Sequence, residues 1–81
     1  MSIIYLESKD NAKIKHLRAL IEQNHYRKKH QQSVIEGTHL ALAYLEHYPL
    51  HAIFTTEIAL QHPDFVKIQQ LYQGHIFVIA Q

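Results

Sequence analysis

The sequence predicts an α/β fold with a small, mainly parallel sheet, and two observations support this class. Short β-prone runs alternate along the chain with segments whose apolar residues recur at the three- and four-residue intervals of a helix. The composition, 47% apolar and 19% charged residues, is that of a packed globular protein. Because strands separated by helices usually pair in parallel, helices should cover the faces of the sheet. A length of 81 residues leaves room for one domain.

The N-terminal part should form a strand followed by an amphipathic helix. Residues 3–6 are apolar and β-prone, and this run stops at Ser8. Ser8, Asp10 and Asn11 all have side chains that cap helix N-termini, so a helix should begin near them. Residues 24–32 lose the helical periodicity, which predicts a helix end and an exposed loop. The apolar face of the first helix is expected at Ala12, Ile14, Leu17, Leu20 and Ile21.

The middle of the chain should add a strand, a bend and a second helix. Residues 33–36 are predicted to form a short strand that enters a tight bend at Gly37. Thr38 can cap the following helix, which should run to about His47. Apolar residues surround most of this helix, so it should pack on more than one side. Pro49 then forces the chain out of the helical conformation.

A further strand and a third helix are expected in the last third of the chain. Residues 50–55 predict a strand, and residues 56–61 predict a helical turn that Pro63 breaks. Asp64 can cap the third helix, and Gly74 should end it. The apolar positions of this helix are Phe65, Ile68, Leu71 and Tyr72.

The end of the chain is predicted to be the most hydrophobic strand, at residues 75–80. A continuous apolar strand needs cover on both faces, and this chain supplies few elements to do that. The strand finishes at Gln81. We therefore expect the chain to be an N-terminal piece of a longer protein, cut just past a strand.

Positive charge is concentrated in the first third of the chain. Residues 9–30 hold seven basic against two acidic residues, a balance of +5, whereas residues 31–81 hold one lysine against four acidic residues. This segregation predicts one face suited to a polyanion, and a solvated helix surface is the alternative interpretation of the same pattern. The seven bases are Lys9, Lys13, Lys15, Arg18, Arg27, Lys28 and Lys29.

The composition also excludes several classes of protein. The absence of cysteine removes disulfide frameworks, thiolate metal sites and cysteine nucleophiles, and it fits a reducing cytoplasm. Residues 40–45 form the longest wholly apolar run, far below the roughly 20 residues of a membrane helix. No signal-peptide pattern is visible, so we expect no membrane partner. With Gly37 and Gly74 as its two glycines, the chain can form neither a GxGxxG loop nor a P-loop.

An ordered series of residues connects the basic third to the segment that follows it. The series is Ser8, Asn11, Lys15, Arg27, Glu36 and Gly37. A leucine-bearing helix separates Lys15 from the basic turn, and a strand leads into the Glu-Gly pair. From about residue 4 to residue 45, this pattern resembles the N-terminal substrate-binding domain of the SpoU/TrmH family of RNA 2′-O-ribose methyltransferases.

The resemblance implies an α/β/α sandwich similar to ribosomal protein L30e, with residues 1–81 as an RNA substrate-binding domain. In that family a linker joins this domain to a knotted SPOUT catalytic domain, which binds S-adenosylmethionine and dimerises. None of the catalytic domain is in these residues. The resemblance thus implies that this chain holds no cofactor and methylates nothing alone. It also implies that the longer protein is a homodimer acting on structured RNA, either rRNA or tRNA.

The basic third supplies the candidate RNA contacts. Lysine and arginine neutralise phosphates and release counterions, while tyrosine and histidine rings stack on splayed bases. Because imidazoles gain charge as the pH falls, RNA affinity should rise between pH 7.5 and 6. His25 is a further stacking candidate, and a core-capping role is the alternative for Tyr26. The residues expected to bind RNA are Asn11, Lys13, Lys15, Arg18, Tyr26, Arg27, Lys28, Lys29 and His30.

Other roles are open for several polar residues in and beside the basic third. Asn11 is as well suited to capping a helix as to contacting RNA. Lys15 can instead lie along Glu22 or Glu36. Glu36 suits a partner for Arg27 or for backbone N–H groups better than a general base, because the sequence names no second titratable group to act with it.

Eight histidines raise the question of a metal site. His47 and His51 are four residues apart, but Pro49 between them breaks the helix that would aim both at one ion. The other six are scattered, and neither cysteine nor an HExxH motif is present, so no metal site is expected.

Two other classes of function stay open beside RNA recognition. The apolar helix after Gly37, together with an uncovered final strand, would suit a protein-interaction or self-association module with an incidental basic face. An enzyme acting alone is disfavoured, because the sequence assembles no nucleophile, base and oxyanion site. Salt discriminates between the classes: RNA binding should weaken sharply as salt rises, whereas apolar association should hold or strengthen.

Overall fold

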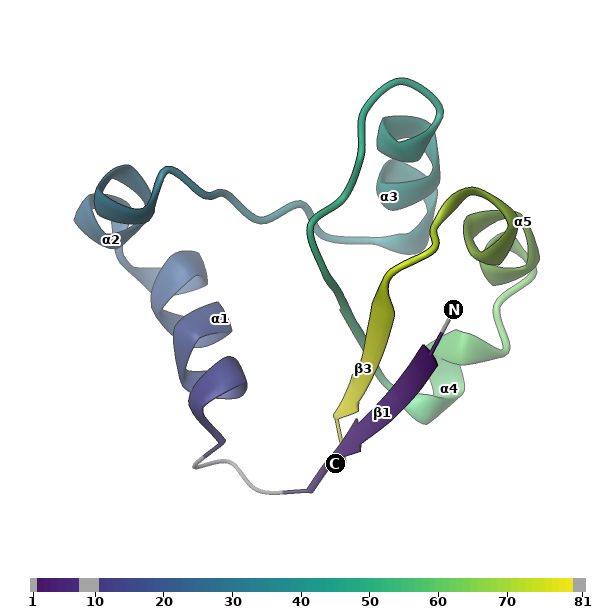
Figure 1. The fold of residues 1–81 in the computed structure, drawn as a ribbon, viewed down its shortest axis with the longest axis horizontal. Coiled ribbons are helices and arrows are strands. Elements are labelled where there is room, and N and C mark those ends of the chain that lie inside the picture. The colour runs from purple at the N-terminus through teal and green to yellow at the C-terminus, as the bar shows by residue number, and fades with distance from the viewer. Residues whose placement is uncertain (1, 8–10, 80–81) are drawn as a thin grey trace.

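The computed structural model describes residues 2–7 and 11–79 and contains a three-stranded parallel sheet (Figure 1). The strands are β1 (Ser2–Leu6), β2 (Ile53–Thr55) and β3 (His75–Ile79), in the order β1-β3-β2. Ile4 of β1 and Phe54 of β2 both pair with Phe77 of β3. The last strand in the sequence is thus the central strand of the sheet.

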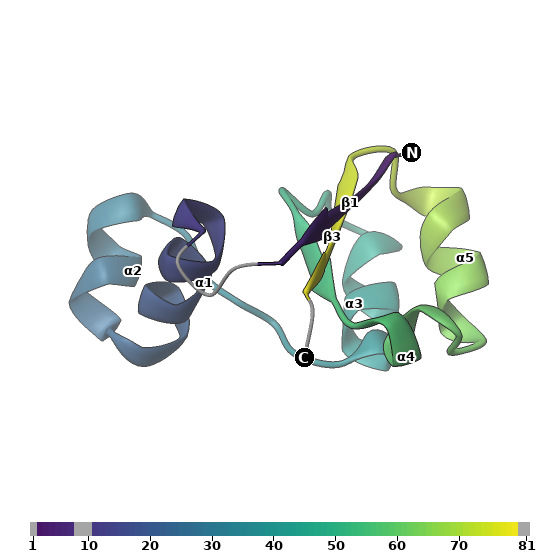
Figure 2. The ribbon, with the colours of Figure 1, turned by 90° about the horizontal axis from the view of Figure 1, so that it is seen from below.

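Helices lie on both sides of the sheet, as Figure 2 shows. The pair α1 and α2 stands on one side, and α3, α4 and α5 lie on the other. The predicted α/β class and the parallel pairing are confirmed, whereas the likeness to ribosomal protein L30e stays a prediction. The helices are α1 (Ala12–Glu22), α2 (Asn24–His30), α3 (Thr38–Leu45), α4 (Glu57–Leu60) and α5 (Asp64–Leu71).

The larger hydrophobic cluster lies between the sheet and the layer formed by α3 and α5. Alternation along β3 directs Ile76 and Val78 to this side, where both are almost fully buried. Ile68 of α5 is 1% exposed and is among the best-buried residues of the domain. The other buried members of this cluster are Leu42, Ile53, Phe65 and Tyr72. This cluster is the principal core.

A smaller cluster lies on the opposite face of the sheet. Phe77 of β3 packs there with Leu6 of β1 and Ile14 of α1. Phe54 stacks on Phe77 with the ring centroids 5.0 Å apart. Within the described residues, α1 is thus attached to the sheet through one buried isoleucine and its neighbours, while Leu20 is buried farther along the helix.

Gly74 is required by the packing of Tyr72 rather than by a helix end alone. The Tyr72 hydroxyl donates a hydrogen bond to the carbonyl of His75 at 2.7 Å. A Cβ atom added at Gly74 would lie 2.5 Å from that hydroxyl oxygen, which is a steric clash. The helix itself ends at Leu71, and Gly74 allows the tyrosine to reach the start of β3.

The prediction of a loop at residues 24–32 is wrong, because Asn24–His30 forms helix α2. Apart from Tyr26, this helix consists of asparagine, histidine, lysine and arginine, and none of its residues is buried. A helix that is polar on all sides has no apolar periodicity by which the sequence can reveal it. It ends at Gln31, whose φ of 53° is in the left-handed region typical of helix C-termini.

The predicted strand at residues 33–36 is also wrong. These residues connect α2 to α3 without joining the sheet (Figure 1). Val34 and Ile35 favour extended backbone, but β propensity produces a strand only where a partner strand is available. The expected bend is confirmed at Gly37, whose φ of 108° is rarely accessible to other residues. Gly37, and not the expected Thr38, is also the N-cap of α3.

Two expectations about packing in the second half are corrected. The strand expected at residues 50–55 is shorter, since pairing with β3 begins at Ile53. Helix α3 was expected to pack on more than one side, yet Leu42 is its one buried residue. Leu40 is 52% exposed, and Tyr44 is exposed as well. Ala41 and Leu45 are partly buried against the larger cluster, and α3 also contacts α5, whereas Leu40 and Tyr44 face outward.

The final strand is not the uncovered edge that the sequence suggested. β3 has a neighbour on each side, and Ile76, Phe77 and Val78 are buried. Self-association by edge pairing of this strand therefore has no structural basis. Within the described residues, β1 is an edge strand instead, and its Ile3, Ile4 and Tyr5 are exposed.

Candidate nucleic-acid interface

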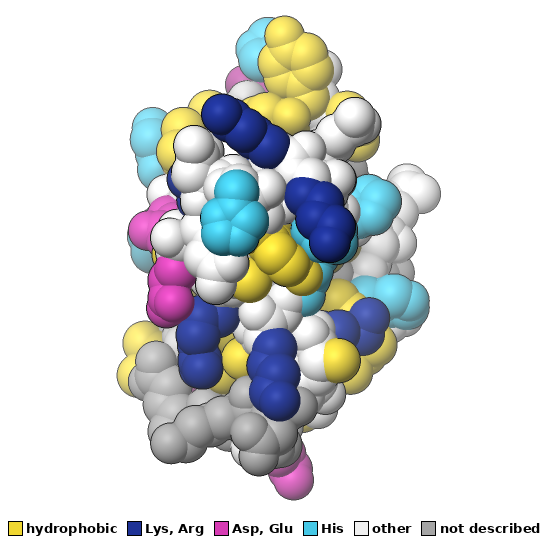
Figure 3. Space-filling model, turned by 90° about the vertical axis from the view of Figure 1, so that its left-hand side faces the viewer, with side chains coloured by type: hydrophobic (Ala, Val, Ile, Leu, Met, Phe, Trp, Pro, Cys, Tyr) yellow, Lys and Arg dark blue, Asp and Glu magenta, His cyan; other side chains and the backbone are white. Residues whose placement is uncertain are grey.

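Cationic side chains cover the outer surface of the α1–α2 pair. Lys and Arg side chains are spread over this face in Figure 3, with histidines among them and acidic side chains toward its margins. We call the exposed cations of the two helices the basic face; they are Lys13, Lys15, Arg18, Lys28 and Lys29. The structure thus brings five of the seven predicted cations together on neighbouring helices, while Lys9 lies outside the described residues.

No carboxylate of the described residues neutralises the cations of the basic face. Within residues 2–7 and 11–79, the ion pair present is His62 Nδ1–Asp64 Oδ2 at 3.7 Å, and no lysine or arginine takes part in one. In particular, Lys15 forms no ion pair with Glu22 or Glu36, the carboxylates suggested as its alternative partners. Their charge is therefore available to an anionic ligand.

Lys13 differs from the rest of the basic face in its orientation. Its ammonium nitrogen lies 5.1 Å from the centroid of the Phe77 ring, a cation–π contact with the smaller cluster. The lysine therefore helps to cover the sheet, although as a residue it is exposed.

Arg27 holds the two helices together. Its Nη1 donates hydrogen bonds to the carbonyl oxygens of Leu20, at 2.6 Å, and Ile21, at 3.0 Å, at the end of α1. These carbonyls have no partner within the helix, so the guanidinium completes the helix terminus. The expectation of Arg27 on an exposed loop is wrong, since it is half-buried in α2.

Glu36 lies near Arg27 without forming an ion pair with it. Both line a polar hollow of about 160 Å³, together with Leu20, Ile21, Ser33 and Val34. The expected pairing of the carboxylate with the guanidinium is thus absent among the described residues. Glu36 remains exposed.

Asn11 is the N-cap of α1. Its Oδ1 accepts a hydrogen bond from the backbone N–H of Lys13 at 2.8 Å, which satisfies one of the unpaired donors at the helix start. The capping role weighed for this residue is therefore confirmed, whereas its contact with RNA stays a prediction. Ser8 and Asp10, the other expected caps, lie outside the described residues.

Three rings form a cluster between α1 and α2, which we call the ring cluster: His16, Tyr26 and His30. The centroids are 5.3 Å apart for His16 and Tyr26, 5.1 Å for His16 and His30, and 4.2 Å for Tyr26 and His30. His16 Nδ1 lies 2.7 Å from the Tyr26 hydroxyl, and its Nε2 lies 2.7 Å from Gln32 Oε1. Tyr26 therefore packs on polar rings between the helices, and not on the hydrophobic core.

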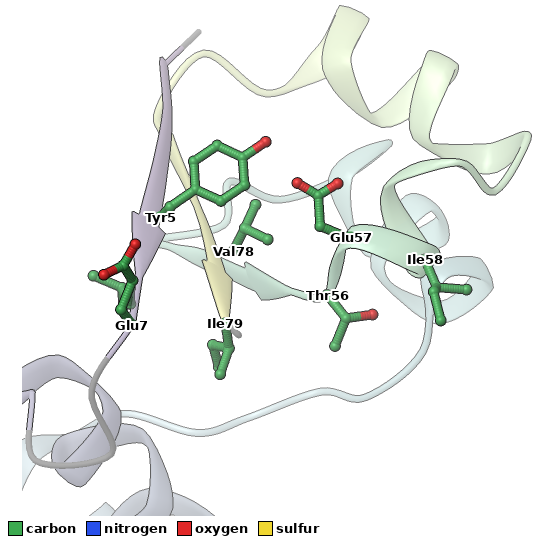
Figure 4. Close-up of a pocket in the computed structure, with 8 residues that line it drawn as sticks. Tyr5, Glu7, Thr56, Glu57, Ile58, Val78 and Ile79 are labelled. Atoms are coloured by element: carbon green, nitrogen blue, oxygen red, sulfur yellow. The ribbon is translucent and has the colours of Figure 1, made fainter. Parts of the chain in front are cut away.

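A second hollow, of about 280 Å³, lies at the carboxyl ends of the strands (Figure 4). Its lining comes from the ends of β1 and β3 and from the start of α4. Tyr5 and Glu57 lie across it from each other, and the Glu57 carboxylate raises the pKa of the Tyr5 hydroxyl. Glu7 is the second carboxylate of the lining, which contains no lysine or arginine. This hollow therefore repels phosphate and is a poor RNA site.

The described residues offer neither a metal centre nor a membrane-spanning helix. No group of three His, Cys, Asp or Glu side chains within residues 2–7 and 11–79 is placed to hold a metal ion. No helix in that part of the chain has both the length and the apolar character needed to cross a bilayer.

The contact between His16 of α1 and Gln32, which follows α2, was not predicted from the sequence. They are sixteen residues apart and meet only because α2 folds back on α1. The sequence did contain one indication of this contact. His16 lies between the apolar positions of the first helix, where a polar ring requires a polar partner. The hollow beside Tyr5 depends on strand order, so the sequence offered no sign of it.

Comparison with known families gives the basic face its context. Residues 11–80 match the model of the MRM3-like substrate binding domain. The chain belongs to the MRM3-like substrate binding domain family. This confirms the resemblance to the N-terminal substrate-binding domain of a SpoU-type methyltransferase, and the match includes the whole α1–α2 pair. No curated protein and no solved structure matches the chain. For an MRM3-like domain, substrate binding for an RNA methyltransferase is the general role.

Proposed function

We propose that this domain recognises structured RNA, either rRNA or tRNA, for a SpoU-type 2′-O-ribose methyltransferase. The observation that carries the proposal is the basic face of this MRM3-like substrate binding domain, whose cations form no ion pair with any described carboxylate. Each lysine or arginine that neutralises a phosphate releases condensed counterions, so several such residues on one face supply affinity without base contacts. The domain would hold the RNA while chemistry occurs elsewhere.

The catalytic part of this proposal lies outside the 81 residues. We infer that S-adenosylmethionine binds to a separate catalytic domain and that the whole protein acts as a homodimer in the cytoplasm. The family relationship supports the separate catalytic domain, and so do the hollows of the described residues, in which no nucleophile, base and oxyanion donors converge. This chain alone should therefore bind RNA without methylating it.

Charge removal from α2 tests the proposal. The double variant Lys28→Ala/Lys29→Ala removes two exposed cations that make no hydrogen bond to the rest of the described residues. We expect its affinity for a labelled RNA stem-loop, measured by fluorescence anisotropy, to fall several-fold. The slope of log affinity against log salt should fall by about 0.7 to 0.9 for each phosphate that the variant no longer neutralises. Arg27 is left intact because it also holds α1 and α2 together.

Lys67→Ala is the matched control, since Lys67 is an exposed lysine on α5, in the opposite helical layer. It should leave both the affinity and the salt slope unchanged. Equal losses in the double variant and the control would mean that general charge attracts the RNA, and the basic face would not be the site. Affinity that does not change with salt would contradict the proposal as a whole.

A further inference from the structure

We propose that the ring cluster is a stacking site for one unpaired base, with His30 as the ring that the base contacts. This inference rests on the proposed function and makes it more specific: the substrate is RNA with an exposed unpaired nucleotide, and not continuous duplex. His30 is the exposed member of the cluster, whereas His16 and Tyr26 are half-buried.

The hydrogen bonds of His16 give the cluster a fixed geometry. Gln32 presents its carbonyl oxygen, which only accepts, so Nε2 of His16 carries a proton and donates to it. In the neutral imidazole Nδ1 then accepts a hydrogen bond from the Tyr26 hydroxyl. Both nitrogens of His16 and the hydroxyl of Tyr26 are thus occupied within the protein. Their role is to position the third ring.

Ring packing carries this positioning to His30. Its ring lies 4.2 Å from that of Tyr26, tilted by 41°, and meets the His16 ring edge-on at 89°. Since α2 buries no residue in a hydrophobic core, these contacts and the hydrogen bonds of Arg27 hold it on α1. His30 is consequently ordered before RNA arrives, and the entropy cost of fixing a stacking platform is reduced.

The surrounding charge suits a nucleotide rather than a neutral aromatic ligand. Lys28 and Lys29 directly precede His30, and both are exposed. A base on the His30 ring would lie on the same two-turn helix as these two cations, which the phosphates of flanking nucleotides can reach. Stacking on protein rings requires a base whose face is free, and in a duplex both faces are covered by neighbouring base pairs. A duplex can therefore use the cations but not the ring.

Two labelled RNAs of equal length separate these contributions: a hairpin with an unpaired loop, and a fully paired duplex. At pH 8, which limits imidazole protonation, we expect His30→Ala to weaken hairpin binding about tenfold. Duplex binding should change less than twofold. His30→Phe keeps a stacking ring without a titratable nitrogen and should restore most of the hairpin affinity. Circular dichroism establishes that each variant keeps its helices.

His39→Ala is the matched control, because His39 is an exposed histidine of α3, in the opposite helical layer, and makes no ring contact among the described residues. It should bind both RNAs like the parent chain. The stacking proposal is overturned if His30→Ala weakens both RNAs equally or neither, or if His30→Phe binds the hairpin no better than His30→Ala. In those cases a loss of both affinities in Lys28→Ala/Lys29→Ala would leave the proposed function standing. If the parent chain bound neither RNA, both proposals would fail.

Discussion

The two helical layers of this domain are held to the sheet in different ways. The layer containing α3 and α5 covers a cluster of seven buried residues among those described. The α1–α2 layer shares a cluster of three, and α2 buries no residue at all. Arg27 and the ring cluster, which are polar, attach α2 to α1 and not to the sheet.

This difference separates the scaffold from the binding surface. Apolar burial supplies most of the stability of a small domain, so the sheet with α3 and α5 should be the last part to unfold. A layer held by few apolar contacts opens at lower free energy, as binding elements often do. The charges that would meet RNA are all on the weakly attached layer. Three variants can test this contrast.

Ile68→Ala should have the largest effect, because Ile68 is 1% exposed in the larger cluster. Truncating such a residue costs about 3 kcal/mol of unfolding free energy, similar to what the core of a domain near this size supplies in total. We expect urea denaturation followed by circular dichroism to show a largely unfolded chain. Val66→Ala, on the exposed side of α5, should stay within about 0.5 kcal/mol of the parent. A folded Ile68→Ala variant would mean that the larger cluster is not the scaffold.

Ile14→Ala should cost less and act locally. Ile14 is the buried residue of α1 in the smaller cluster, and its truncation should remove about 2 kcal/mol. Native-state hydrogen exchange should show reduced protection in α1 and α2, with β3 and α5 still protected. Ile21→Ala removes the same atoms from an exposed position of α1 and serves as the control. A uniform decrease of protection across both layers would show that they unfold as one unit.

Tyr72→Phe should have the smallest effect, and that effect should depend on pH. Burial raises the pKa of the Tyr72 hydroxyl, and the backbone N–H of Ile53 opposes this only in part. The folded state thus favours the neutral phenol. Its contribution is fully present below the unfolded value of about 10 and is lost as the pH rises through the folded pKa.

Below pH 9, Tyr72→Phe should cost about 1 kcal/mol, because the variant cannot donate the hydrogen bond to His75. Between pH 9 and 11 the parent chain should lose stability more steeply than the variant in urea titrations. Tyr48→Phe, at an exposed tyrosine, should follow the parent curve. Parallel curves for Tyr72→Phe and the parent would show that the phenol does not titrate with unfolding.

Elements with a strong local pattern were predictable from the sequence. The three-residue spacing of Ile14, Leu17 and Leu20 marked α1, and Asn11 capped it as anticipated. Glu57–Leu60 forms the expected helical turn, and Asp64–Leu71 the expected helix, although its N-cap is Pro63 and not the expected Asp64. In these segments the apolar periodicity and the helix-breaking residues favour the same conformation, so the local structure depends little on contacts with distant residues.

Elements without such a pattern were predicted wrongly. Helix α2 has no apolar face, so its conformation depends on contacts with α1 through Tyr26 and Arg27. Residues 33–36 have β-branched side chains but no neighbouring strand. The candidate site shows the same division: the cations could be identified from the sequence, whereas the partners of His16 and the structural bonds of Arg27 could not.

The amino-acid sequence by itself determined the α/β class, the parallel pairing and the clustering of positive charge in the first third of the chain. All three properties can be inferred from the order of residue types along the chain, and that order is the same in any packing arrangement. Tertiary structure decided that β3 is central, that α2 folds back on α1, and that His16, Tyr26 and His30 meet. Contacts between residues far apart in the chain depend on which surfaces are buried together, and that is settled only when the whole domain packs.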